Sequence, residues 1–140
     1  MRLVLVGAGH AHLHLLAHAG TLRAAGLDPV LVAPARFDYS GLATGVLSGA
    51  VGREAAGLDV AALAKAARVE HHPTQVSAVD LAGRRLILAE GAPQAFDLIS
   101  FNIGSVSRDP RGLARQPEVW PVKPLDNLFA LKSWLEAEMT

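Results

Sequence analysis

The sequence contains no cysteine among its 140 residues. A chain without thiols can form neither a disulfide framework nor a redox-active disulfide, and it offers no thiolate nucleophile. The cytoplasm is the default compartment for such a chain, and we expect it there.

Excess charge of either sign is also missing. Lysine and arginine number 13, aspartate and glutamate number 13, and the formal net charge is zero. This balance gives no electrostatic reason to expect nucleic acid or an acidic membrane surface as a partner. Aromatic residues make up only 5%, whereas just over half of the residues are apolar. Length and composition predict one globular domain over residues 1–140.

Long apolar runs are absent too. No stretch reaches the ~20 residues that a membrane span needs, so we expect no spanning segment. The N-terminus has some features of a signal peptide, because Met1 and Arg2 precede an apolar run and Ala17-His18-Ala19 imitates a cleavage site. Four histidines and two glycines interrupt that run, which makes it a poor export segment.

The first 33 residues have the pattern of a βαβ unit. Residues 3–6 form a compact apolar run that predicts a buried strand, and residues 7–9 form a glycine turn. Good helix formers occupy residues 10–25, Gly26 is suited to end the helix, and residues 29–33 predict a second buried strand. Two strands connected in this way are expected to be parallel.

The rest of the chain predicts further elements of both kinds. A glycine-rich connection at residues 35–57 contains a predicted short helix at 42–47. The other predicted elements are a helix at 60–67 capped by Asp59, a strand at 69–71, a hairpin of 75–81 and 84–90 joined at Ala82-Gly83, a strand at 96–103 and an amphipathic helix at 125–139. Together they predict an α/β fold of the Rossmann-like FAD/NAD(P)-binding type, with a parallel central sheet and an additional small β-hairpin or meander.

Chemistry is expected at the first turn, which reads Gly7-x-Gly9-x-x-His12. In a dinucleotide-binding fold the first glycine permits the tight turn, the second lets a diphosphate approach the backbone, and the third lets helix and strand pack closely. Phosphates then lie against free N–H groups at the helix start. Two positions match and the third is His12, so a plain packing turn is the alternative.

The acidic residue that usually binds the ribose hydroxyls is missing. The second strand is expected to end near Ala33, and neither Ala33 nor Pro34 has a side chain that accepts a hydrogen bond. Asp28 comes too early and Asp38 rather late for this role.

Histidines are concentrated near the N-terminus. His10, His14 and His18 are spaced four apart and would form one stripe on a helix. A metal site is one interpretation of this stripe. Alternatively, His10-x-His12-x-His14 has the form of a metal-binding strand end in a barrel hydrolase, although such a barrel needs roughly 250 residues. The other interpretation places His10 near a nucleotide and leaves the remaining two to pack or meet solvent. The pair His71-His72 is expected to be solvated.

Four segments together resemble one family. They read LVLVGAGHAH at residues 3–12, DYSGLATG at 38–45, FDLISFNIGS at 96–105 and PVKP at 121–124. They resemble the FAD-dependent pyridine nucleotide-disulfide oxidoreductases related to type II NADH dehydrogenases, with the closest likeness to the flavoprotein module fused to selenide, water dikinase. The second segment is similar to that group's Tyr-Ser-Gly-x-x-x-Gly, and the third to its Asp-x-x-Ser-x-x-x-Gly-Ser strand end. The likeness spans essentially the whole chain.

The resemblance implies that FAD binds on the first βαβ unit, with its diphosphate over the glycine turn. The loop after the second strand would approach the cofactor. The backbone at Val76 would lie beside the adenine, and Gly104 would close over the nucleotide. The implied cofactor-binding residues are Gly7, Ala8, Gly9, His10, Ala11, Ala33, Pro34, Ser40, Gly41, Val76 and Gly104. The flavin performs the redox chemistry in such proteins, so no catalytic side chain is expected here.

In that family a separate, later domain binds NAD(P)H, and hydride passes through the flavin to an acceptor. We therefore expect this chain to be an N-terminal portion that is completed by the NAD(P)H-binding half or by a second copy, with peripheral membrane association of the full enzyme as a further possibility. A catalytically inactive nucleotide-binding or assembly module is the alternative. A metal-dependent hydrolase that uses the histidine run is the third hypothesis.

Overall fold

The fold is known from a computed structural model, which describes residues 1–105, 108–109, 112, 116 and 119–138. The chain divides into two compact units. Unit 1 consists of Met1–Phe37 and Asp59–Ile103, and unit 2 consists of Asp38–Leu58 and Gly104–Thr140. Much of the loop predicted after Ser105, and Met139 at the end of the last predicted helix, lie outside the described residues.

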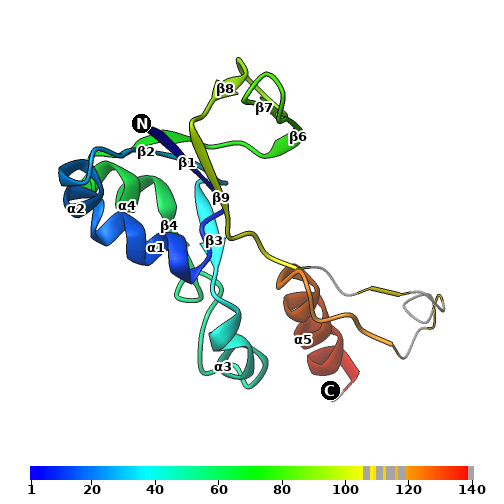
Figure 1. The fold of residues 1–140 in the computed structure, drawn as a ribbon. Coiled ribbons are helices and arrows are strands. Elements are labelled where there is room, and N and C mark those ends of the chain that lie inside the picture. The colour runs from blue at the N-terminus through cyan, green and yellow to red at the C-terminus, as the bar shows by residue number, and fades with distance from the viewer. Residues whose placement is uncertain (106–107, 110–111, 113–115, 117–118, 139–140) are drawn as a thin grey trace. The chain divides into compact units, whose positions relative to one another are not determined.

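Unit 1 is built on a four-stranded parallel sheet (Figure 1). Its strands are β1 (Arg2–Val6), β2 (Asp28–Val32), β5 (Glu70–His72) and β9 (Leu98–Phe101), in the order β5-β2-β1-β9. β1 therefore has a parallel neighbour on each side, which confirms the predicted βαβ arrangement.

The helix predicted over residues 10–25 is two helices, α1 (His10–Ala17) and α2 (Ala19–Ala24). At His18 the backbone leaves helical geometry, with φ −110° and ψ 21°. The ring Nδ1 of His18 lies 2.9 Å from the carbonyl oxygen of His14, which is also approached by the His18 backbone N–H. The break between the two helices thus coincides with this side-chain bond to the backbone. Gly26 follows with φ +80°, as a helix-ending glycine does.

The two faces of the sheet are covered by different elements. Leu3 and Leu5 share a core with residues of α1, α2 and α4 (Val60–Ala66), whereas Val4 and Val6 share another with the antiparallel strands on the opposite face. Because side chains alternate along a strand, a continuous apolar run such as 3–6 fills both cores. Figure 1 shows these helices and strands on opposite sides of β1 and β2.

The predicted hairpin forms a small antiparallel sheet. Its strands are β6 (Val76–Asp80), β7 (Arg85–Leu88) and β8 (Gln94–Ala95), in that order. The hairpin prediction is confirmed, and β8 makes it a meander. The turn is held by Asp80, whose carboxylate accepts hydrogen bonds from the Gly83 N–H at 2.8 Å and from Arg85 at 2.9 Å.

Unit 2 contains a 3₁₀ helix (Ser40–Leu42), α3 (Ala43–Leu47) and α5 (Asp126–Glu138), with Val46, Ala56, Leu125 and Leu128 as its buried core. The short helix and the C-terminal helix were predicted. The paired strands β3 (Arg36–Asp38) and β4 (Gly57–Asp59) were not predicted, because three-residue strands show no periodicity.

None of the helices that the structure describes has the length and apolar character that crossing a membrane requires.

The helix α4 begins as the sequence predicts. Asp59 precedes its first residue, and its side-chain oxygen accepts a hydrogen bond from the Ala62 N–H at 2.8 Å. This is an N-cap, which satisfies one of the amides that a helix start leaves without a partner.

Candidate functional site

The turn between β1 and α1 is held between two neighbouring strands. The Gly7 N–H donates to the Val32 carbonyl of β2 at 2.8 Å, and the Gly9 N–H donates to the Asn102 carbonyl after β9 at 3.0 Å. Gly7 has φ +89°, a conformation that favours glycine, and Gly9 is the N-cap of α1 in an extended conformation. The turn thus starts α1 directly above the carboxyl ends of three parallel strands.

Both glycines are required by the close approach of Asn102. A Cβ at Gly7 would lie 2.5 Å from the Asn102 carbonyl oxygen, and a Cβ at Gly9 would lie 2.3 Å from Asn102 Oδ1 and 2.7 Å from its carbonyl oxygen. Real Cβ atoms do not approach other heavy atoms so closely. The space that the fingerprint assigns to a diphosphate at the second glycine is therefore partly taken by the chain itself.

Asn102, which directly follows β9, also caps α1. Its Oδ1 lies 3.0 Å from the Ala11 amide nitrogen and 3.4 Å from that of His12. Both partners are N–H donors, so the carboxamide oxygen, not its nitrogen, faces the helix. The N-cap Gly9 has no side chain for this role, and Asn102 supplies it instead.

His12, at the third position of the fingerprint, is a buried polar residue with 1% of its surface exposed. Its Nδ1 lies 2.7 Å from the Gly7 carbonyl oxygen and its Nε2 lies 2.9 Å from Ser100 Oγ. A carbonyl oxygen only accepts, so Nδ1 carries the proton and Nε2 of the neutral ring accepts from the serine hydroxyl. Burial lowers the pKa of His12 below its ordinary value, and the bond to Gly7 partly offsets this effect.

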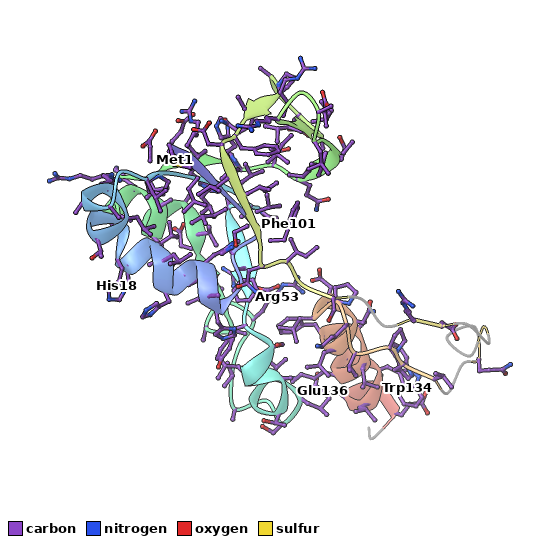
Figure 2. All side chains as sticks on the ribbon, viewed as in Figure 1. Met1, His18, Arg53, Phe101, Trp134 and Glu136 are labelled. Carbon is purple, nitrogen blue, oxygen red and sulfur yellow. The ribbon has the colours of Figure 1, made fainter. Side chains whose placement is uncertain are left out.

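The other N-terminal histidines lie on the surface. The rings of His14 and His18 are 4.3 Å apart and both residues are exposed, as Figure 2 shows for His18 at the end of α1. The ring of His10 meets that of Phe37 edge-on at 6.3 Å. Within the part of the chain that the structure describes, no three histidine, aspartate or glutamate side chains gather as metal ligands would.

The end of β2 is contacted by a histidine of the neighbouring strand β5. Ala33 is buried and Pro34 is exposed. The ring nitrogen Nε2 of His71, on the neighbouring β5, lies 2.8 Å from the Ala33 carbonyl oxygen, and the ring of His72 meets Glu70 at 2.9 Å. Both rings thus have protein partners, although both residues are only partly buried and remain in contact with solvent.

Val76 lies in unit 1 but on the other side of the sheet from α1. It begins β6 opposite Leu88, and its partly buried side chain packs into the core shared with Val4 and Val6. The structure thus brings together Gly7, Ala8, Gly9, His10 and Ala11 at one turn and places Ala33 and Pro34 at the end of the adjacent strand.

The remaining predicted site residues, Ser40, Gly41 and Gly104, belong to unit 2. Gly41 packs against the ring of Tyr39, because a Cβ there would lie 2.4 Å from the ring carbon that bears the hydroxyl. Gly104 has open space around it. Ser40, Gly41 and Gly104 are all exposed, and their approach to a cofactor stays a prediction.

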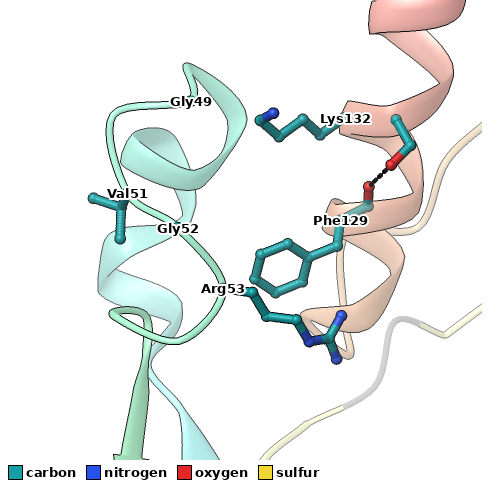
Figure 3. A pocket seen from close by; sticks show the side chains of 7 residues that line it. Gly49, Val51, Gly52, Arg53, Phe129 and Lys132 are labelled. Atoms are coloured by element: carbon teal, nitrogen blue, oxygen red, sulfur yellow. Dashed lines mark hydrogen bonds between the residues drawn. The ribbon is translucent and has the colours of Figure 1, made fainter.

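Unit 2 contains a pocket of about 350 Å³ between the loop after α3 and one face of α5 (Figure 3). Arg53 and Lys132 supply its positive charges, and the guanidinium of Arg53 lies 4.5 Å from the centre of the Phe129 ring. Arg53 forms an ion pair with Asp126, and Lys132 forms one with Glu136. Each cation is therefore matched by a carboxylate close by.

The glycine turn fits an anionic ligand better than this pocket does. The start of α1 carries the partial positive charge of a helix N-terminus, its first turn has no acidic residue, and His10 and Ala11 are exposed. Asn102 presents a neutral oxygen there, not a charge. The turn is thus chemically suited to a diphosphate, with one side of it already occupied by the carboxamide.

Comparisons with known proteins identify the fold. No protein-family model and no curated protein matches the chain. Among solved structures, sulfide:quinone oxidoreductase from the hyperthermophilic bacterium Aquifex aeolicus matches with a TM-score of 0.77 at 16% identity, over 97% of this chain and 32% of that one. Putidaredoxin reductase, from its covalent complex with putidaredoxin, matches with a TM-score of 0.68 at 22% identity, over 96% of this chain and 34% of that one.

These likenesses establish that the chain has a Rossmann-like α/β fold shared with two oxidoreductases, as the sequence predicted. The chain spans about a third of the length of each of those structures.

Three residues that form this site were not identified from the sequence. Asn102 and Ser100 lie some 90 residues from the turn that they contact, and the sequence presents His12 as a departure from the fingerprint or as part of a histidine run. One signal was present: Ser100 and Asn102 are two apart in the strand predicted over 96–103, which would place both on one side, and both are polar in an apolar segment. His71 gave no signal beyond its position at a strand end.

Proposed function

We propose that this chain binds FAD at the turn between β1 and α1 and forms the FAD-binding portion of an NAD(P)H-dependent flavoprotein oxidoreductase. The observation that carries the proposal is the exposed start of α1, which follows a buried parallel strand and a two-glycine turn and has no acidic residue in its first turn. The sequence resemblance to a FAD-dependent family and the fold shared with two oxidoreductases support it.

In this proposal the chain holds the cofactor and the flavin, when bound, supplies the redox chemistry. Gly7 directs the backbone out of β1, and the positive end of α1 faces the diphosphate beside Asn102, which already caps the amides of Ala11 and His12. The NAD(P)H site and the electron acceptor belong to a further domain or partner. The proposal assigns no acid, base or nucleophile to this chain.

Ala11 allows a sharp test of the diphosphate site. It is exposed and is the second residue of α1, so Ala11→Asp adds a carboxylate at a position where helices tolerate it and a diphosphate would not. Ala61 is the matched control, because it is the exposed second residue of α4. FAD binding is measured by the flavin absorbance that elutes with the protein in gel filtration, and by titration.

The proposal predicts that the wild-type chain and Ala61→Asp bind FAD alike, and that Ala11→Asp binds it at least about tenfold more weakly with an unchanged melting temperature. A wild-type chain that binds no FAD, or an Ala11→Asp variant that binds it equally well, would contradict the assignment.

A second candidate function is a catalytically inactive assembly module. Asn102 requires glycine at positions 7 and 9 without any ligand, so the fingerprint is also explained by packing alone. Phe101 and Ile103 expose 51% and 63% of their surfaces at the end of the sheet's edge strand, and a second copy or another domain could cover them. Absence of FAD binding, together with concentration-dependent self-association in sedimentation experiments, would favour this candidate.

A further inference from the structure

Ser100 and His12 connect β9 to the glycine turn through one continuous set of hydrogen bonds. The Ser100 hydroxyl donates to His12 Nε2 at 2.9 Å, and His12 Nδ1–H donates to the Gly7 carbonyl at 2.7 Å. This connection begins two residues before Asn102, whose oxygen accepts from the Ala11 amide on the same turn. The turn is thus anchored twice to β9.

The connection occupies the position where the dinucleotide fingerprint has its third glycine. A glycine there lets helix and strand pack closely by having no side chain. Here a side chain of full size lies between α1 and the sheet, with 1% of its surface exposed. An imidazole can be buried at this position because each ring nitrogen has a partner; otherwise its polar atoms would be buried without hydrogen bonds.

We propose that Ser100 and His12 are a pair of positioning residues that replaces the third glycine, and that their hydrogen bonds fix the turn in the geometry that binds a dinucleotide diphosphate. This inference rests on the proposed function. His12 is the third residue of α1, so a shift of its ring moves the amides of the first turn. The Gly7 carbonyl belongs to the peptide that bends away from β1. Neither side chain needs to touch the ligand.

Comparing Ser100→Thr with Ser100→Val distinguishes the effect of losing the hydrogen bond from the effect of changed packing. Threonine and valine have nearly the same shape and both favour strands, so any loss of stability caused by the added methyl branch is common to the two variants. Only threonine keeps the hydroxyl. Ser77, on β6 of the hairpin, serves as a control, because its hydroxyl donates to the Ile87 carbonyl at 3.0 Å far from the turn in sequence and fold.

The first measurement is made without ligand. The ¹⁵N chemical shifts of the imidazole report which ring nitrogen carries the proton and whether the other accepts a hydrogen bond. We expect a neutral ring protonated at Nδ1 in the wild type and in Ser100→Thr, and loss of the Nε2 hydrogen bond in Ser100→Val. The Nε2-protonated tautomer in the wild type would overturn the proposal, since the Gly7 carbonyl would then have no donor.

The second measurement is FAD affinity. We expect Ser100→Thr and Ser77→Val to bind within about threefold of the wild type, and Ser100→Val to bind roughly tenfold more weakly, as expected from a buried acceptor left without its donor. Equal binding by the threonine and valine variants, with a wild type that binds FAD, overturns the positioning role alone. A wild type that does not bind FAD overturns the proposed function, and the role of Ser100 and His12 in binding falls with it.

Discussion

The glycine turn of unit 1 and the pocket of unit 2 hold their polar groups in opposite ways. At the turn the groups are neutral, with His12 buried and Ser100 and Asn102 half-buried, and each of the three bonds to specific atoms of the backbone or of one another. At the pocket the groups are charged, and the side chain of Arg53 exposes 55% of its surface while forming its ion pair with Asp126. The strength of hydrogen bonds between buried neutral groups depends on the exact position of donor and acceptor, whereas the side chains of an exposed ion pair can adjust and their charges are screened by water. A change of one atom should therefore matter at the turn and hardly at all at the pocket.

Glycine-to-alanine substitutions give the largest contrast between the two regions. Gly7→Ala must adopt φ near +89° and places its Cβ 2.5 Å from a backbone oxygen, so we expect a loss of about 3 kcal/mol or more in unfolding free energy. Gly52, in the pocket wall, has nothing within 4 Å of a Cβ, and Gly52→Ala should change stability by less than about 0.5 kcal/mol. Urea unfolding of both variants checks this. Equal losses would show that the turn is no more constrained than the pocket.

Lowering the pH should destabilise unit 1 through His12. Its pKa is lowered in the folded chain, chiefly by burial, so between the folded pKa and the ordinary value near 6.5 the unfolded chain binds more protons. The contribution of His12 to the unfolding free energy is therefore fully present above about pH 6.5. It is lost as the pH falls through the pKa of the folded chain, and it changes no further below that pKa.

Unfolding free energies between pH 8 and pH 5 measure this effect. His12→Gln should remove the dependence that is due to this residue, whereas His14→Gln, at an exposed position, should leave it in place. A wild-type curve that matches that of His12→Gln would contradict the buried neutral imidazole.

The smallest effect is expected at the pocket. Arg53→Ala removes an exposed ion pair and a cation–π contact with Phe129, and we expect a loss of about 0.5–1 kcal/mol, reduced further by salt. Thermal unfolding at low and high ionic strength measures it. A loss of unfolding free energy comparable with that of Gly7→Ala would mean that unit 2 holds a buried charge network, and that the turn and the pocket do not differ in the way described above.

Local patterns predicted most of the fold. The apolar runs at residues 3–6 and 29–33, the cap at Asp59 and the hairpin turn before Arg85 each depend on neighbouring residues, and each is found in the structure. The break at His18 was missed because no glycine or proline marks it in the sequence.

Only half of the candidate site could be predicted in this way. The two glycines pointed to the turn, because a tight turn after a buried strand has a sequence signature. Their partner Asn102 could not be found, since a contact across about 90 residues leaves no local pattern. His12 seemed to be a defect in the fingerprint, and it proved to be a connection that needs Ser100 as its second half.

Backbone amide NMR tests most directly whether the diphosphate of FAD binds at the positive end of α1, beside the Asn102 cap. On titration with FAD, we expect the ¹H–¹⁵N resonances of Ala8, Gly9, His10 and Ala11 to shift first and saturate together, and those of Gly52 and Arg53 at the pocket to stay unchanged. Resonances of the turn that stay in place while FAD is shown to bind elsewhere, or no shift at any concentration, would contradict it.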